Sequence, residues 1–233
     1  MLELNDIIKE LIYDQEWESI HKCAVDLNAP LPPIEPAIMI VDHKTKEETI
    51  FGTLGNFSLI KGKAKSRKSF LLSIIVSNLL SEVAFFETLS SPRIGSKNKV
   101  LYIDTEQSDW HVQNIAHRIL KLSGSENQDW LMMYKFRSLM PAERLKYTEK
   151  LIKSTSDLKV VVIDGIRDLI TSINDEAESS LIASMLLKWS EQYNVHIITI
   201  LHENPTNDKA RGHLGTELSN KSETVVQVEV DAK

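Results

Sequence analysis

Short runs of apolar residues recur from residue 100 onward, and polar residues follow each of them. The runs lie at residues 100–103, 159–163 and 195–201, which are apolar except for Lys159, His196 and Thr199. Continuous apolar runs of this length are typical of strands that are buried on both faces of a parallel sheet. Segments of helical length separate the runs, so strands and helices alternate. This alternation predicts an α/β fold in which helices cover both faces of a mostly parallel sheet.

The remaining elements follow from apolar periodicity and from turn residues. Further strands are predicted at 37–41, 49–53, 56–60, 131–136 and 224–230, the last of them at a sheet edge. Helices are predicted after residue 69, from 108 or 109 to about 122 with Gly124 as the stop, from Pro141 to about 154, and within 174–194. We expect a polar loop from 205 to about 220.

The beginning of the chain has a different pattern. Residues 2–27 predict one or two amphipathic helices, and residues 28–36 contain four prolines, which is typical of a connector. We therefore expect an N-terminal helical and hairpin extension over 1–55 and a core over 56–233. The pattern leaves open whether the extension is a lid or a docking element.

Composition excludes several classes of protein. The 233 residues carry a net charge of −6, which argues against a surface coated for nucleic acid. Cys23 is the only cysteine, so neither an intrachain disulfide nor a cysteine metal cluster is available. The acidic N-terminus is unlike a signal peptide, and the apolar tract 69–89 carries serine, asparagine and glutamate, so we expect no membrane span and a cytoplasmic protein.

A basic loop between the strand at 56–60 and the helix after it has the pattern of a phosphate-binding P-loop. Its residues are Gly62, Lys63, Ala64, Lys65, Ser66, Arg67, Lys68 and Ser69. Such a loop directs backbone N–H groups and a helix N-terminus at an anion. We expect 62–70, up to Phe70, to hold ATP, with Lys68 over the phosphates and the Ser69 hydroxyl on Mg²⁺.

One position of the loop departs from the pattern. Arg67 stands where the pattern has its second glycine, which lets the backbone approach the phosphates closely. If this position needs a left-handed backbone, an arginine there costs roughly 1–2 kcal/mol. The departure bears more on the rate of hydrolysis than on binding. The alternative is that the stretch is only a basic, solvated turn before a core helix.

Polar residues at three other strand ends complete the candidate site. Asp164 follows an apolar run and is expected to hold Mg²⁺. Gly165 leaves no glutamate beside it, so Glu106 is the candidate for activating water, and Asp104 is a weaker one. His202 is the candidate sensor of the γ-phosphate. The alternatives are a strand-capping aspartate, a helix-capping glutamate and a histidine satisfied at the sheet edge.

The order of these motifs resembles the RecA-like P-loop ATPases. The P-loop, YIDTEQ, VVVIDG, ITILHEN and RGHLGTEL follow one another over roughly 57–230. The chain looks most like hexameric helicases of the RepA and DnaB type and the AAA_25 ATPases of plasmids and mobilisable transposons. The resemblance implies a catalytic Glu106, a Walker B Asp164 and a sensor His202.

The resemblance also implies partners. Relatives assemble as rings or filaments, here a hexamer, with ATP between subunits and a cation donated by the neighbour. Lys209 and Arg211 are the candidates for that cation, the alternative being a plain solvated loop. Loops after the sensor strand track single-stranded DNA in this family, although residues 205–220 offer few aromatics for stacking. Other replication or mobilisation proteins are further expected partners.

The function we expect is ATP binding and hydrolysis by a RecA-like protein that acts on DNA in the replication or transfer of a mobile element, as a helicase-type ring. Two alternatives remain open at this point. One is a nucleotide-gated DNA-binding or assembly protein with little turnover, which Arg67 motivates. The other is an interaction module whose P-loop is vestigial.

Overall fold

The computed structural model describes residues 4–42, 44–81, 89–90, 99–124, 128–204 and 208–230. Its chain divides into two compact units, Met1–Ile34 and Glu35–Lys233. The first unit contains one helix, α1 (Leu4–His21), within the stretch for which helices were predicted. Within the described residues, no helix combines the length and the apolar character that crossing a membrane requires.

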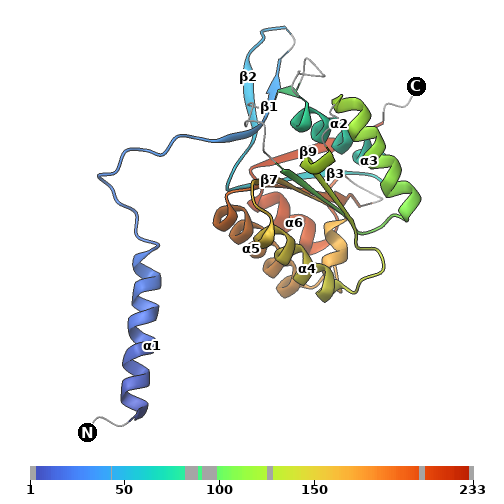
Figure 1. Cartoon of the computed structure of the whole chain (residues 1–233). Helices are drawn as coiled ribbons and strands as arrows, with labels where there is room; N and C mark the ends of the chain where they lie inside the picture. The colour runs from blue at the N-terminus through green and yellow to red at the C-terminus, as the bar shows by residue number, and fades with distance from the viewer. Residues whose placement is uncertain are drawn as a thin grey trace. The chain divides into compact units, whose positions relative to one another are not determined.

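The second unit is built on a six-stranded sheet, seen between the layers of helices in Figure 1. All of its neighbouring strands run parallel. The strands in spatial order are β6 (Leu131–Lys135), β5 (Lys99–Asp104), β7 (Leu158–Asp164), β8 (His196–His202), β3 (Phe57–Gly62) and β9 (Thr224–Val228). The predicted α/β fold is confirmed, and β9 occupies the edge that its alternating pattern predicted.

A separate antiparallel sheet stands beside the start of β3. It consists of β2 (Glu48–Thr53), β1 (Pro36–Val41) and the short β4 (Leu89–Ser90), so the predicted hairpin is confirmed. Thr53 anchors it, because its backbone N–H and its hydroxyl both donate to the Glu223 carboxylate, at 2.8 and 2.9 Å. The ring of buried His196 donates from Nδ1 to the Thr53 carbonyl at 2.8 Å. The hairpin is thus tied to the strand β8 that pairs with β3.

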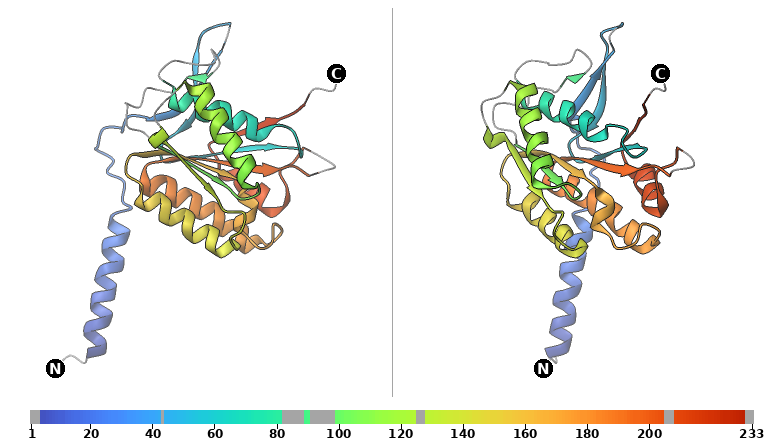
Figure 2. Two further views of the ribbon diagram at one scale, coloured as in Figure 1. Left: turned by 45° about the vertical axis from the view of Figure 1, so that its right-hand side comes forward. Right: turned by 90° about the vertical axis from the view of Figure 1, so that its right-hand side faces the viewer.

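Helices cover both faces of the parallel sheet, as Figures 1 and 2 show. On one face lie α2 (Lys68–Leu80) and α3 (Asp109–Ser123), and on the other lie α4 (Pro141–Ser154), α5 (Glu176–Tyr193) and α6 (Gly212–Lys221). Two short 3-10 turns, η1 (Gln128–Trp130) and η2 (Ile166–Leu169), precede β6 and follow β7. Pro141 begins α4 and Gly124 ends α3 in a left-handed conformation, as predicted.

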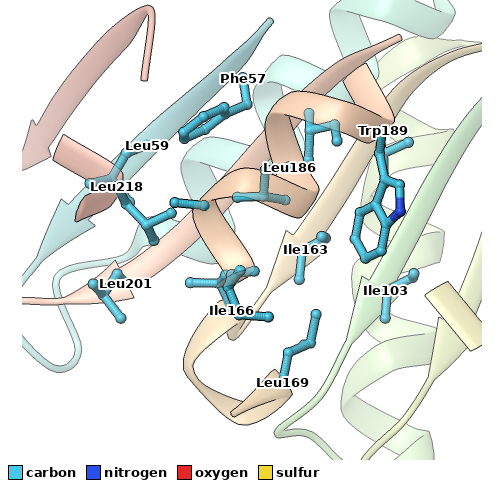
Figure 3. Close-up of a cluster of buried hydrophobic side chains, with 14 of the residues drawn as sticks. Phe57, Leu59, Ile103, Ile163, Ile166, Leu169, Leu186, Trp189, Leu201 and Leu218 are labelled. Carbon is cyan, nitrogen blue, oxygen red and sulfur yellow. The ribbon is translucent and has the colours of Figure 1, made fainter. Parts of the chain in front are cut away.

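Strand residues alternate between two apolar cores. Val161 and Ile163 of β7 point into the core under α5 and α6, whereas Val160 and Val162 point into the core under α2 and α3. Figure 3 shows the first core, in which Trp189 of α5 lies among the strand side chains. Burial on both faces explains why these strands read as continuous apolar runs.

The expected loop over 205–220 is wrong in its second half. Residues 212–221 form α6, whose Leu214 and Leu218 are completely buried in the core under α5. Burying two leucine side chains contributes about 3–6 kcal/mol, which exceeds the helix-propensity cost of the two glycines in this segment. Residues 205–207 lie outside the described part of the chain.

Candidate functional site

A cavity of about 520 Å³ opens at the carboxyl ends of the parallel strands, where ligands of such sheets bind. Its walls come from the P-loop, from the residues after β5 and β7, from the end of β8 and from α3. The lining residues are Lys65, Ser66, Arg67, Lys68, Ser69, Phe70, Glu106, Arg118, Asp164, Gly165, Arg167, Ile200, Leu201 and His202. The structure therefore brings Lys68, Ser69, Glu106, Asp164 and His202 together, as the strand ends predicted.

The P-loop turns sharply between β3 and α2. Arg67 immediately precedes α2 and has φ 68° and ψ 27°, so this position does need a left-handed backbone. Lys65 has φ 62° as well. Gly62 is required for space, because a Cβ there would lie 2.5 Å from the Val228 carbonyl oxygen and 2.7 Å from Ser66 Oγ. The loop thus has backbone strain at Arg67, where the P-loop pattern has its second glycine. It keeps the first glycine, Gly62, where the neighbouring atoms are closest.

Lys68 lies inside its own loop. Its ammonium donates to the carbonyls of Gly62 and Lys63, at 2.9 and 2.8 Å, and contacts Nδ1 of His202 at 3.2 Å. Burial lowers the pKa of Lys68, and the carboxylates of Asp164, Glu106 and Glu203 oppose that shift. Only 6% of the residue is exposed, and Lys68 is among the residues that line the cavity.

Asp164 accepts two hydroxyl hydrogen bonds on one oxygen. Ser69 Oγ and Tyr102 Oη each donate to its Oδ2 at 2.8 Å. Burial, reinforced by the nearby charge of Asp104, raises the pKa of Asp164, while the two hydroxyls and Lys68 oppose the shift. Burial also raises the pKa of Tyr102 well above its usual range, so its hydroxyl stays a donor.

These oxygen atoms fit a magnesium ion bound with a nucleotide. Ser69 and Asp164 place a hydroxyl and a carboxylate side by side, and Mg²⁺ prefers hard oxygen ligands completed by phosphate and water. Asp104 adds a second carboxylate nearby, with a buried Oδ2 that has no hydrogen-bond partner among the described residues. Concentrated negative charge of this kind favours a cation.

The Asp104 side chain shapes the loop that carries Glu106. Its Oδ1 accepts from the backbone N–H groups of Glu106 and Gln107, at 2.9 and 2.7 Å. Asp104 is almost completely buried, which raises its pKa. Glu106 instead lines the cavity with a half-exposed side chain, and burial together with the charges of Asp164 and Asp168 raises its pKa. The geometry thus gives Asp104 a positioning role and leaves Glu106 accessible.

His202 stands between the lysine and the glutamate. Its Nδ1 faces Lys68, and its Nε2 lies 3.9 Å from Glu106 Oε1. Burial, then the charges of Lys68 and Arg211, lowers the pKa of His202. A neutral ring with the hydrogen on Nε2 accepts from the Lys68 ammonium and presents an N–H toward Glu106. If a phosphate displaces Lys68, the contact between the Lys68 ammonium and His202 Nδ1 would therefore change.

The two candidate neighbour-facing cations lie on the segment after β8. The backbone N–H of Arg211 donates to the His202 carbonyl at 3.1 Å, and the carbonyl of Lys209 accepts from Asn204 at 3.0 Å. Neither side chain lines the cavity of its own chain. Their place next to the sensor strand agrees with the order of the motifs, and their action on a neighbouring subunit stays a prediction.

Three residues at the site were not predicted from the sequence. Tyr102 lies inside the apolar run 100–103, so its sequence context indicates a core residue. Arg118 of α3 has its guanidinium 5.4 Å from the centre of the Phe70 ring, and Arg167 lies in η2. Arg167 follows Asp164 by three residues, so its position along the chain is a usable signal. Arg118 lies twelve residues after Glu106, with no such signal.

The comparison with known families agrees with this geometry. The family model AAA_25, described as an AAA domain, matches residues 41–208. No curated protein matches the chain. The matched span contains the P-loop and all three polar strand ends of the cavity, Glu106, Asp164 and His202. Because the match covers well over half of its residues, the chain belongs to the AAA_25 family of AAA-type P-loop ATPases.

Proposed function

We propose that the chain binds Mg-ATP in the cavity at the strand ends and hydrolyses it. The observation that carries the proposal is the convergence of Lys68, Ser69, Glu106, Asp164 and His202 on one cavity. The P-loop cation supplies charge for the phosphates, and Glu106 supplies an accessible carboxylate. Burial raises the pKa of that carboxyl, which makes it a better proton acceptor than an ordinary glutamate while it remains ionised.

Hydrolysis in this site is an in-line displacement. The oxygen of a water bonds to the γ-phosphorus while the bond from that phosphorus to the bridging oxygen breaks, and its electron pair leaves with ADP. Glu106 accepts the proton of the water, and Lys68 stabilises the developing negative charge. Ser69 and Asp164 would hold magnesium, which supplies further charge stabilisation when it is bound.

We further assign the ATPase to DNA handling in the replication or transfer of a mobile element, in a ring or filament of identical subunits. The order of the motifs and the AAA_25 family support this assignment. We assign Lys209 and Arg211 to the site of a neighbouring subunit, because both follow β8. In a ring, the cations Lys209 and Arg211 would be repeated around the channel.

The test is the Mg-dependent ATPase rate of the wild-type chain with and without single-stranded DNA, with size-exclusion chromatography under the same conditions. We expect turnover that rises when DNA is added and an assembled species in the presence of ATP. Turnover that ignores DNA would leave an ATPase and remove the DNA assignment. Absence of turnover, together with tight ATP binding, would contradict the proposed hydrolysis.

One observation favours a second function, a nucleotide-gated DNA-binding or assembly protein with little turnover. It is the left-handed Arg67, whose side chain sits where phosphates need close backbone approach. Replacing Arg67→Gly removes both the strain and the side chain.

We expect Arg67→Gly to raise the free energy of unfolding by about 1 kcal/mol, since glycine adopts this conformation freely. If the chain is an ATPase, the turnover of the two chains is the second expectation. Wild type and variant should both turn over ATP. For the gated binder, only the variant turns over. Lys46→Gly is the matched control, because Lys46 is another left-handed residue, with φ 59°, in the hairpin turn and away from the cavity. Urea unfolding and steady-state ATPase rates distinguish the two cases.

A further inference from the structure

The cavity contains two arginines of the same chain beyond the P-loop. Arg118 approaches from α3 and is stacked over Phe70, next to Ser69. Arg167 approaches from η2, whose N-cap residue Gly165 directly follows Asp164. The proposed reaction uses neither of them. The question is whether either guanidinium is available to a phosphate.

The segment η2 packs directly against the glutamate that the reaction uses. A Cβ on Gly165 would lie 2.1 Å from Thr105 Oγ1 and 3.3 Å from Glu106 Cγ. Thr105 Oγ1 donates to one of three nearby acceptors: the carbonyls of Asp164 and Gly165, at 3.1 and 3.0 Å, and Asp168 Oδ2 at 3.0 Å. Arg167, which lines the cavity, therefore belongs to a turn that is fixed against the Glu106 loop.

Asp168 contacts both the Glu106 loop, through Thr105, and the Arg167 side chain. Its Oδ2 is one of the three acceptors within reach of the Thr105 hydroxyl, and its Oδ1 lies 3.4 Å from the Arg167 guanidinium. Arg144 also approaches Asp168 Oδ2, at 4.0 Å, and donates to the carbonyls of Phe136, Arg137 and Asp168. The guanidinium donors of Arg144 are thus used in hydrogen bonds to backbone carbonyls, and its positive charge lies near the Asp168 carboxylate.

Arg167 is in the opposite situation. Among the described residues, its guanidinium makes a single long hydrogen bond, to Asp168, and its side chain is 50% exposed. A guanidinium has five N–H donors in a planar fork that matches phosphate oxygens. Most of these donors are free at a cavity that already holds Lys68 and Glu106. An exposed ion pair of this kind contributes little to stability. Asp168 therefore orients the Arg167 side chain but does not hold it in a strong ion pair.

We infer that Arg167 is a catalytic residue that acts in cis, contacting the γ-phosphate of ATP bound to its own chain. The inference rests on the proposed ATPase function. As the phosphorus–oxygen bond breaks, negative charge spreads over the γ-phosphate oxygens, and the Arg167 fork neutralises it beside Lys68. Asp168 is the positioning residue that aims this fork and keeps it in register with the Glu106 loop through Thr105.

The test compares the full-length wild-type chain with Arg167→Ala, Arg167→Lys and the matched control Arg137→Ala. Arg137 is exposed and does not line the cavity. We expect Arg167→Ala to lower kcat by about 10³-fold, the lower end of the range for arginines that serve this purpose. KM and ADP affinity should stay near wild type, and trapping of ADP with aluminium fluoride should be lost. Arg167→Lys should restore kcat only in part, since an ammonium lacks the fork.

A mixing experiment separates action in cis from action on a neighbour. Arg167→Ala chains are mixed with Lys68→Ala chains, so that any oligomer contains both. If Arg167 acts in cis, every site in the mixture lacks one of the two cations and stays inactive. Recovered turnover on mixing would show that Arg167 serves the neighbouring subunit and would overturn the inference.

The remaining outcomes are equally decisive. Wild-type turnover that Arg167→Ala retains, with fluoroaluminate trapping intact, overturns this inference and leaves the ATPase standing. A wild-type chain without turnover contradicts the proposed function itself. ADP binding by the Arg167 and Arg137 variants, measured by calorimetry, reports whether each is folded, and Arg167→Lys supplies the same comparison if Arg167→Ala binds no ADP. Urea unfolding reports whether Lys68→Ala is folded, since that variant is expected to lose nucleotide binding.

Discussion

Glu106→Gln is expected to lower kcat for ATP hydrolysis by about 10²–10⁴-fold, the range for loss of a general base. The amide keeps the shape of the side chain but does not accept the proton of the attacking water. Binding of Mg-ATP should persist or tighten, because burial beside Asp164 and Asp168 already disfavours the negative charge of Glu106. Single-turnover rates together with ATP affinity from calorimetry measure the two effects separately.

Glu191→Gln is the matched control for this variant. Glu191 is exposed on α5, and the same change of charge there leaves the cavity untouched. A Glu106→Gln chain that hydrolyses ATP at the wild-type rate would assign the base to another group, with Asp104 as the next candidate. Asp104→Asn then becomes the informative comparison, although it also removes the acceptor that folds the Glu106 loop.

Lys68→Ala is expected to abolish both turnover and stabilisation by nucleotide. Mg-ATP at about 100 times its dissociation constant should add roughly 2.7 kcal/mol to the stability of the wild-type chain. For a chain of this size that corresponds to roughly 5–10 °C in Tm. The variant should show no such shift, because the cation that the P-loop directs at the cavity is gone.

Lys188→Ala controls for the loss of one positive charge, since Lys188 is exposed on α5. Differential scanning calorimetry with and without Mg-ATP gives both shifts under one set of conditions. An unchanged shift in Lys68→Ala would mean that nucleotide stabilises the chain elsewhere. No shift in wild type would favour the interaction module with a vestigial P-loop.

The sheet could be predicted from the sequence because its strands are buried on both faces. Runs such as 160–163 are apolar throughout, so they stand out without knowledge of their neighbours. Their carboxyl ends meet at one edge for geometrical reasons alone, which is why Glu106, Asp164 and His202 could be assigned to one site. The left-handed requirement at Arg67 could be stated only as a condition until the loop conformation was known.

Helix α6 could not be predicted because its two glycines are required by contacts with residues outside the helix. A Cβ on Gly212 would lie 2.6 Å from the Ile173 carbonyl oxygen, and a Cβ on Gly215 would lie 2.4 Å from the Ala210 carbonyl carbon. These glycines allow close packing at the start of a helix, whereas in the sequence they indicate a loop. The four-residue spacing of Leu214 and Leu218 was the competing signal, and burial in the core decides in its favour.

The side-chain network around Asp164 was also beyond sequence reasoning, because it depends on which strands are neighbours. Tyr102 reaches Asp164 only because β5 pairs with β7, where Asp104 and Asp164 stand opposite each other. Arg144, Asp168 and Thr105 likewise come from three separate segments. Contacts of this kind follow from pairing and register, which local patterns do not contain.

The position of β3 between β8 and β9 has a consequence for synthesis of the chain. The Thr199 hydroxyl contacts the Ser58 carbonyl across 141 residues, and Lys61 donates to the Gln227 side chain across 166 residues. The strand that leads into the P-loop therefore has no neighbour in its sheet until β8, 141 residues further on at the Ser58–Thr199 contact, has left the ribosome. Pairing over such separations is slow, and the unpaired edge is prone to aggregation meanwhile. Nucleotide binding should thus appear only after β8 has paired with β3, and a stop codon shortly before His196 should remove it.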